Sequence, residues 1–230
     1  VWPVAQAQDV LEFYAEWSSK GLSRELYTGP AMVTLPDGTG VVAIEVVYNG
    51  DPAQGEKEIA PLRTIGTPID DGIKMQDYKV MQTQEDAAFG HGVRSYIKSG
   101  MVSEITQGLV DMMIESYKSD PRLMVFTHTL GGAAKRVGES DTAFPHRNAE
   151  TMLGVGGGWM DPADDESAIA ASRDWYYQLE PFMGGYYDNI DFDGAGAVGN
   201  YGPAYERLSK IKGEYDPGNL FRLNSNVEPT

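Results

Sequence analysis

The spacing of apolar residues along the chain predicts five helices. Near the start, Val10, Phe13 and Trp17 recur at helical intervals, which is typical of a helix with one buried face. Asp51 and Asp161 each precede a proline, and an Asp-Pro pair is a common signal for the beginning of a helix. We therefore expect helices over residues 5–19, 51–66, 101–117, 161–182 and 203–215.

Runs rich in β-branched and aromatic residues predict strands between these helices. Pro36, Asp37 and Gly38 separate two such runs, as in a turn that joins antiparallel strands. This order of elements favours an α+β fold in which a large antiparallel β-sheet carries helices mainly on one face. The predicted strands cover residues 31–35, 40–48, 74–82, 91–99, 121–130 and 151–159.

A glycine-rich stretch between residues 184 and 202 separates the last two predicted helices, and we interpret it as a structural loop at a boundary. Part of it follows the spacing of an EF-hand calcium loop. Position twelve of that loop would be Asn200, however, where calcium binding needs a bidentate glutamate, so a calcium-binding domain is the weakest of our hypotheses. The residues that fit the EF-hand positions are Asn189, Asp191, Asp193 and Gly194.

Charge and composition exclude several classes of function. The chain carries 34 acidic and 18 basic residues, and a net charge of −16 argues against nucleic acid and anionic membrane surfaces as partners. No apolar run is long enough to cross a bilayer, so we expect a soluble protein, with the cytoplasm favoured although the compartment is left open. The absence of cysteine excludes disulfides and thiolate chemistry, and three scattered histidines predict no metal site.

Six segments in the same order resemble the carboxyl-terminal half of the berberine bridge enzyme-like FAD-linked oxidases. The longest, residues 204–229, contains YDPGNLFRLN, which follows the family pattern YDP-x-NLFR-x-N. Asp216 to Asn219 in that segment have the residues of a type II turn. The other five segments are PLRTIG, DYKVMQ, GGAAKRV, TAFPHR and GGYYDN.

This resemblance implies a division of the chain into two parts. Residues 1–185 correspond to a substrate-binding domain, and residues 186–230 to a berberine bridge enzyme-like carboxyl-terminal segment that docks on an FAD-binding domain of the same protein. That FAD-binding domain has no counterpart in this sequence, and the chain opens with Val1 instead of methionine. We expect a fragment, or one chain of a split protein, that is inactive alone and whose FAD is held mainly by the missing domain.

The resemblance also suggests site residues. Tyr187 and Asn189 match the tyrosine and asparagine of the family's Y-x-N-[YF] motif, so Tyr187 is the candidate catalytic base and Asn189 a candidate flavin contact. Ile190 stands where relatives usually have a second aromatic residue. A free tyrosine titrates near pH 10, so a tyrosine base needs hydrogen bonds or positive charge close by. Asn219, in the closing segment, is a second candidate cofactor contact.

Substrate-facing residues are expected on the strand before Trp159. Met152, Gly154 and Gly156 alternate along it and should share one smooth, uncharged face, which suggests room for a bulky or apolar substrate. Tyr78 and Gln82 are further candidates, for which core packing is an equal alternative.

Two hypotheses about function follow. The first is the substrate-binding half of an FAD-dependent oxidoreductase that oxidises an alcohol or amine carbon by hydride transfer to flavin, with O2 as acceptor. The second is a stand-alone, non-catalytic binding module that retains the fold without flavin. The sequence does not specify the substrate, the oligomeric state, or whether the flavin is covalently bound.

Overall fold

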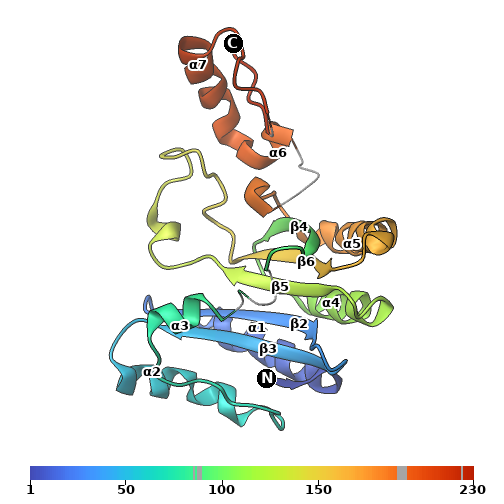
Figure 1. Ribbon diagram of the computed structural model, residues 1–230. Helices are drawn as coiled ribbons and strands as arrows, with labels where there is room; N and C mark the ends of the chain where they lie inside the picture. The colour runs from blue at the N-terminus through green and yellow to red at the C-terminus, as the bar shows by residue number, and fades with distance from the viewer. Residues whose placement is uncertain (85, 87–89, 191–195, 224) are drawn as a thin grey trace.

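The structure is a computed structural model that describes residues 1–84, 86, 90–190, 196–223 and 225–230. Its centre is a six-stranded antiparallel sheet in the order β1-β3-β2-β5-β6-β4 (Figure 1). With helices packed against it, the sheet confirms the predicted α+β class. The strands are β1 (Trp2–Pro3), β2 (Leu26–Thr34), β3 (Gly40–Tyr48), β4 (Arg94–Val102), β5 (Met124–Thr129) and β6 (Thr151–Trp159).

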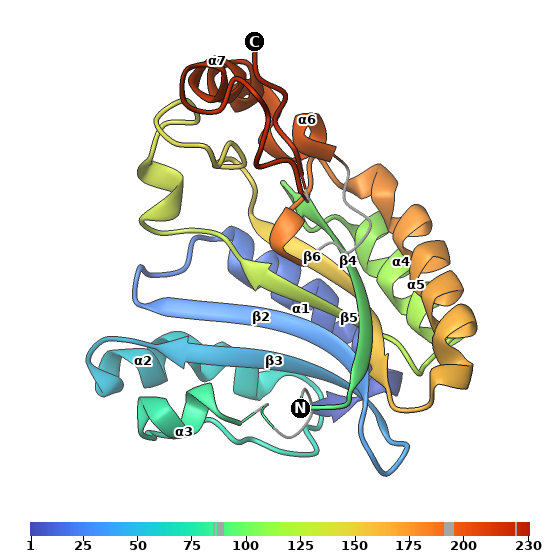
Figure 2. The ribbon, with the colours of Figure 1, turned by 45° about the horizontal axis from the view of Figure 1, so that its top comes forward.

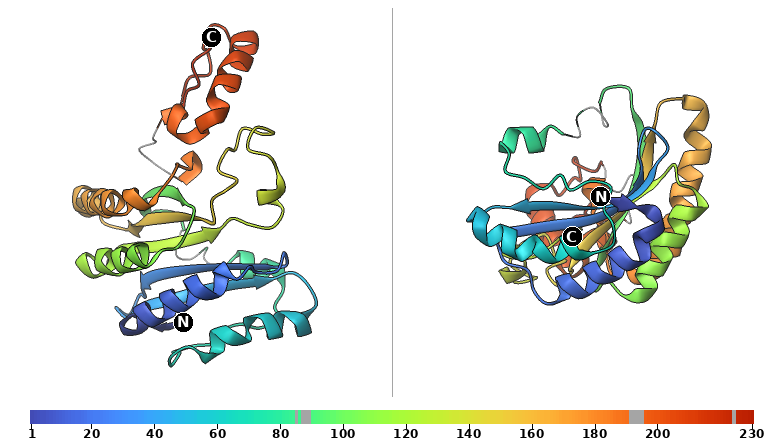
Figure 3. Two further views of the ribbon diagram at one scale, coloured as in Figure 1. Left: turned by 180° about the vertical axis from the view of Figure 1, so that it is seen from behind. Right: turned by 90° about the horizontal axis from the view of Figure 1, so that it is seen from below.

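Three long helices, α1 (Ala7–Ser19), α4 (Gln107–Ser119) and α5 (Asp165–Leu179), form one layer on one face of the sheet (Figures 2 and 3). Apolar side chains from alternate strand positions, such as Val42, Leu153 and Val155, are fully buried beneath this layer. We call this face the helix-covered face. None of the described helices is long and apolar enough to span a membrane.

The remaining helices lie at the two ends of the sheet. Helices α2 (Pro52–Ile59) and α3 (Tyr78–Gln82) lie near β3, whereas α6 (Gly196–Tyr201) and α7 (Tyr205–Tyr215) extend beyond the opposite end (Figure 1). Short 3-10 segments also occur, at Val4–Gln6, Ala60–Thr64, Ala134–Arg136, Pro162–Asp164, Glu180–Phe182, Asp188–Ile190 and Gly202–Ala204.

The strand register defines the opposite face of the sheet, which we call the open face. Met101 on β4 pairs with Met152 on β6, and Met152 pairs with His128 on β5. Because side chains alternate between faces, these three residues project on the side away from α1, α4 and α5. The open face is therefore where a ligand can reach the sheet.

One predicted helix begins later than expected, and one predicted strand is wrong. The helix expected over residues 101–117 begins only at Gln107, because Met101 is still paired in β4 and Thr106 caps the helix by accepting a hydrogen bond from the Leu109 amide at 3.2 Å. The strand expected over residues 74–82 is instead irregular chain followed by α3. The Asp77 carboxylate caps that helix by accepting from the Lys79 amide at 2.9 Å.

The carboxyl-terminal region differs from expectation in two details. The interval predicted as a loop contains α6, and three of the EF-hand positions in it, Asp191, Asp193 and Gly194, lie outside the described residues. The turn after α7 is not type II, since a positive φ of 50° occurs at Asn219 and not at Gly218. The Asn219 amide still closes the turn on the Asp216 carbonyl at 3.0 Å.

Candidate active site

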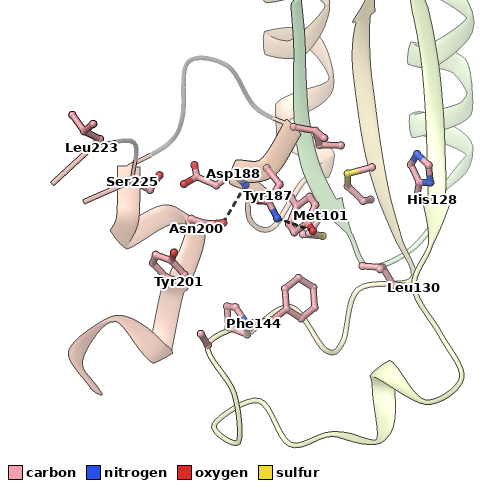
Figure 4. A pocket seen from close by; sticks show the side chains of 15 residues that line it. Met101, His128, Leu130, Phe144, Tyr187, Asp188, Asn200, Tyr201, Leu223 and Ser225 are labelled. Carbon is pink, nitrogen blue, oxygen red and sulfur yellow. Dashed lines mark hydrogen bonds between the residues drawn. The ribbon is translucent and has the colours of Figure 1, made fainter. Parts of the chain in front are cut away.

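A cavity of about 900 Å³ lies between the open face of the sheet, the connection from β5 to β6, and the segment that follows Gly185 (Figure 4). Its floor is formed by Met101 and Met152, which pair across β4 and β6. Leu130, Phe144 and Ile190 pack around these methionines and make a second apolar cluster, separate from the main core. A cavity of this size and lining is typical of a small-molecule site.

Tyr187 and Asn189 lie together at this cavity. The Asn189 side-chain amide donates a hydrogen bond to the Tyr187 hydroxyl oxygen at 2.9 Å. The Tyr187 ring meets Phe144 edge to face, with ring centroids 6.3 Å apart. The Ser99 hydroxyl donates to the Tyr187 carbonyl at 3.2 Å, which fixes the backbone against β4. The two residues of the family motif therefore form a hydrogen-bonded pair beside an apolar floor.

Backbone pairing explains why Tyr187 reaches the sheet. The Met101 amide donates to the Gly185 carbonyl at 2.8 Å, and the Gly184 amide donates to the Met101 carbonyl at 2.7 Å. A Cβ atom on Gly185 would lie 2.3 Å from the His146 ring, so only glycine fits at this point. The chain is thus held along β4, which delivers Tyr187 to the cavity.

His146 and Asn200 connect this segment to α6. His146 Nε2 donates to the Asn200 carbonyl at 2.9 Å, and the Asn200 side-chain oxygen accepts from the Asp188 amide at 3.3 Å. Burial lowers the pKa of His146, although hydrogen bonds to the Asn200 and Tyr186 carbonyls oppose that shift. His146 therefore links this segment to the backbone of α6 through the Nε2 hydrogen bond to the Asn200 carbonyl.

Of the three residues predicted to face the substrate from β6, only Met152 lines the cavity. Gly154 is covered by Phe126, because a Cβ atom there would lie 2.3 Å from the tip of that ring. At Gly156 the backbone of β4 approaches so closely that a Cβ atom would lie 2.1 Å from the Tyr96 carbonyl oxygen. These glycines make room for protein atoms.

Three other candidates lie away from the cavity. Tyr78 and Gln82 are exposed on α3, and Tyr78 borders a separate hollow beside β3 and α2. Asn219 lies in the turn after α7, where its side-chain amide donates a hydrogen bond to the Glu228 carboxylate at 3.3 Å. The Asn219 side-chain oxygen is buried and has no hydrogen-bond partner within the described part of the chain.

Sequence reasoning missed several residues of the cavity, among them His128 and Phe144. A usable signal existed for His128, because strand alternation through Phe126 and His128 places both on one face. The pairing of His128 with Met152 depends on strand order, which the sequence did not provide. Phe144 lies in the long connection before β6, and nothing in the local sequence indicated that it folds over the methionines.

The lining of the cavity fits the ring system of FAD better than its diphosphate. Its apolar and aromatic lining, with a hydroxyl and an amide at one side, suits an aromatic ring system. None of the described lining residues is lysine or arginine, so nothing there matches the charge of a diphosphate. The residues present are therefore compatible with the ring end of the cofactor, which Asn189 is predicted to contact, and not with its phosphates.

Comparison with known proteins found a family model and several relatives that match the chain. Residues 189–228 match the family model "Berberine and berberine like". An FAD-linked oxidoreductase of Dictyostelium discoideum is 29% identical over 236 residues, which cover the whole chain and 51% of the relative. The chain is related to the berberine bridge enzyme-like FAD-linked oxidoreductases. A second relative, aclacinomycin-N/aclacinomycin-A oxidase of Streptomyces galilaeus, is 27% identical over 46% of the chain and 23% of its own length.

Solved structures of berberine bridge enzyme-like proteins share the fold. Wild-type BBE-like 1 of Physcomitrella patens superposes with a TM-score of 0.83 over the whole chain and 53% of its own length, at 16% identity. Chitooligosaccharide oxidase gives a TM-score of 0.70 at 19% identity, over the whole chain and 54% of its own length. The chain thus spans about half the length of the relatives that it matches from end to end.

Proposed function

We propose that this chain is the substrate-binding half of an FAD-dependent oxidoreductase that oxidises an alcohol or amine carbon, with O2 as the final acceptor. The observation that carries the proposal is the cavity in which Tyr187 and Asn189 meet the apolar floor of Met101 and Met152. We assign residues 1–185 to substrate binding and residues 186–230 to a segment that docks on the FAD-binding domain. The family relationship supports FAD as the cofactor.

The residues of the cavity have distinct roles in this proposal. Bound FAD supplies the acceptor for a hydride that leaves the substrate carbon. The Tyr187 oxygen takes the proton from the substrate hydroxyl as general base, while Asn189 holds that oxygen by its 2.9 Å hydrogen bond. The methionine floor and Phe144 keep water away from the reacting carbon, which strengthens the polar contacts made there.

The carboxyl-terminal segment supports a docking role. Tyr215, Leu220, Phe221 and Leu223 are 74% to 86% exposed, which is unusual for a cluster of large apolar side chains. Leu223 also borders the cavity. Since the full-length relatives are about twice as long as this chain, the occupant that we propose for this surface is the FAD-binding domain of the same protein.

The test uses the full-length protein. We expect a yellow protein whose flavin absorption bleaches anaerobically on addition of an alcohol substrate. Tyr187→Phe should lower kcat by about 10²-fold to 10⁴-fold, the range expected for loss of a general base. The matched control is Tyr177→Phe, since Tyr177 is 60% exposed on the helix-covered side, in α5.

Two outcomes would contradict the proposal. A Tyr187→Phe variant within threefold of the wild-type kcat would exclude Tyr187 as the base. A colourless native protein of this same length would favour the stand-alone binding module, because no flavin would then be available for the oxidation.

A further inference from the structure

His128 is a titratable side chain in the cavity that the proposed proton transfer does not use. It projects from β5 beside Met152, and its imidazole is exposed to the cavity. Figure 4 shows His128 well apart from Tyr187 at the cavity, and the strand register places Met152 between Met101 and His128, so an apolar surface runs from Tyr187 toward His128. A molecule that reaches Tyr187 along this floor has its other end near His128.

Two aromatic rings hold the imidazole in place. The Tyr27 hydroxyl lies 3.0 Å from Nδ1 of His128. The Phe126 ring meets the imidazole edge to face, with centroids 5.4 Å apart and an interplanar angle of 88°. A side chain with contacts on two sides loses little conformational freedom when it binds a ligand, which makes it suited to recognition.

Two glycines leave room for these rings. A Cβ atom on Gly29 would lie 3.1 Å from the Tyr27 hydroxyl and 2.5 Å from the Thr127 carbonyl. A Cβ atom on Gly154 would lie 2.3 Å from Phe126. Both glycines belong to central strands, where glycine ordinarily weakens a sheet. The arrangement around His128 therefore depends on four residues from three strands.

The chemistry of the site indicates what His128 can bind. Because Nδ1 is engaged by Tyr27, Nε2 is the ring nitrogen without a hydrogen-bond partner among the described residues. Nε2 donates in one tautomer of the imidazole and accepts in the other. A hydroxyl group can pair with either tautomer, since it both donates and accepts.

We propose that His128 determines specificity by binding a hydroxyl group of the substrate that is remote from the oxidised carbon. This inference rests on the proposed function and extends it to a substrate class. The ligand is an uncharged, mainly apolar molecule of two or more rings with an oxygen function at each end. One oxygen lies at Tyr187, the rings cover the methionine floor, and the second oxygen is bound by His128.

The experiment measures binding to the full-length protein by calorimetry under anaerobic conditions. The probes are 4-phenylbenzyl alcohol and its 4′-hydroxy derivative, which differ only in the remote hydroxyl. We expect wild type to bind the hydroxylated probe about threefold to tenfold more tightly, the range for one neutral hydrogen bond. His128→Ala should abolish this preference and leave the Kd of 4-phenylbenzyl alcohol within twofold. His91→Ala, in an exposed turn before β4, is the matched control and should retain the preference.

A second variant separates a binding role from a structural one. Tyr27→Phe retains the ring over Gly29 but removes the hydroxyl, so we expect part of the preference to be lost and the melting temperature to stay within 2 °C of wild type. In turnover, His128→Ala should raise KM for the hydroxylated probe and leave kcat within twofold.

Each remaining outcome overturns the inference. Equal affinity of wild type for the two probes, a preference that persists in His128→Ala, or no binding of either probe at millimolar concentration would each do so. Flavin bleaching without any effect of His128 would refute this inference alone, whereas a His128-dependent preference without bleaching would refute only the proposed oxidation.

Discussion

Replacement of Gly154 by alanine tests how the open face of the sheet is built. The new methyl group would lie 2.3 Å from Cζ of Phe126 and 2.7 Å from each Cε atom. Ordinary contact begins near 3.4 Å, so the ring must retreat by about 1 Å. Retreat is restricted because the ring packs against His128 and the second apolar cluster. We expect Gly154→Ala to lower the free energy of unfolding by about 1–3 kcal/mol, the range for overpacking.

A double-mutant cycle isolates this contact. In a Phe126→Ala background the methyl group meets no ring, so Gly154→Ala should then cost less than about 0.5 kcal/mol. The coupling free energy between the two sites should be about 1–2 kcal/mol, measured by urea denaturation followed by tryptophan fluorescence. The control is Gly131→Ala, since a Cβ atom there meets nothing within 4 Å and the residue does not have a positive φ. Additive effects in the cycle would refute the claim that Gly154 makes room for Phe126.

Three further predictions concern the carboxyl-terminal region. Burial lowers the pKa of His146 below its ordinary value of 6.5, so the unfolded state binds the proton first and the free energy of unfolding decreases as the pH falls below about 6.5. In His146→Gln the midpoint of urea denaturation should therefore depend less on pH between 7.5 and 5.5. An unchanged pH dependence would contradict this. Asn219 has a φ of 50°, so Asn219→Ala should lower the free energy of unfolding by about 1 kcal/mol and Asn219→Gly by less, as measured by urea denaturation. Loss of flavin from full-length Asn219→Gly would additionally support the predicted cofactor contact. Phe221→Ser should change the free energy of unfolding of this chain by no more than about 0.5 kcal/mol, because the ring is 77% exposed. It should, however, lower the temperature at which the full-length protein releases flavin. An unaltered release temperature would count against docking through this surface.

Local sequence signals predicted much of the fold. Strands β3 and β6 have the predicted bounds, and the carboxylate of Asp161 accepts from the Ala163 amide at 2.9 Å as expected for a cap. The errors arose where contacts between distant segments decide whether a residue lies in a strand or a helix. Nothing in the sequence around Met101 showed that this residue belongs to a strand, because the partner strand begins about 50 residues later at Thr151. Residues 74–82 carry apolar side chains that fit a strand, yet the Asp77 cap begins a helix.

The candidate site was predictable only in part. The family motif identified Tyr187 and Asn189, and alternation on β6 identified Met152, which the structure brings to the same cavity. The environment of Gly154 could not be predicted, because the ring that covers it comes from β5 and its position depends on strand order. The same limit applied to His128, whose neighbours Tyr27 and Phe126 are far from each other in the sequence.

The strand order has a consequence for how the chain folds during synthesis. Strand β4 is made before β5 and β6, but among the described strands it pairs only with β6. The backbone N–H and C=O groups of β4 therefore have no strand partner until residue 159 has left the ribosome. Contacts between distant segments also form slowly, because a long loop must close first. Since Met101, Met152 and Tyr187 come together only after that step, we expect the cavity to be the last part of the molecule to form. Until then the apolar residues of β4 are exposed to solvent and can promote aggregation. We expect the need for chaperones to be greatest during this interval.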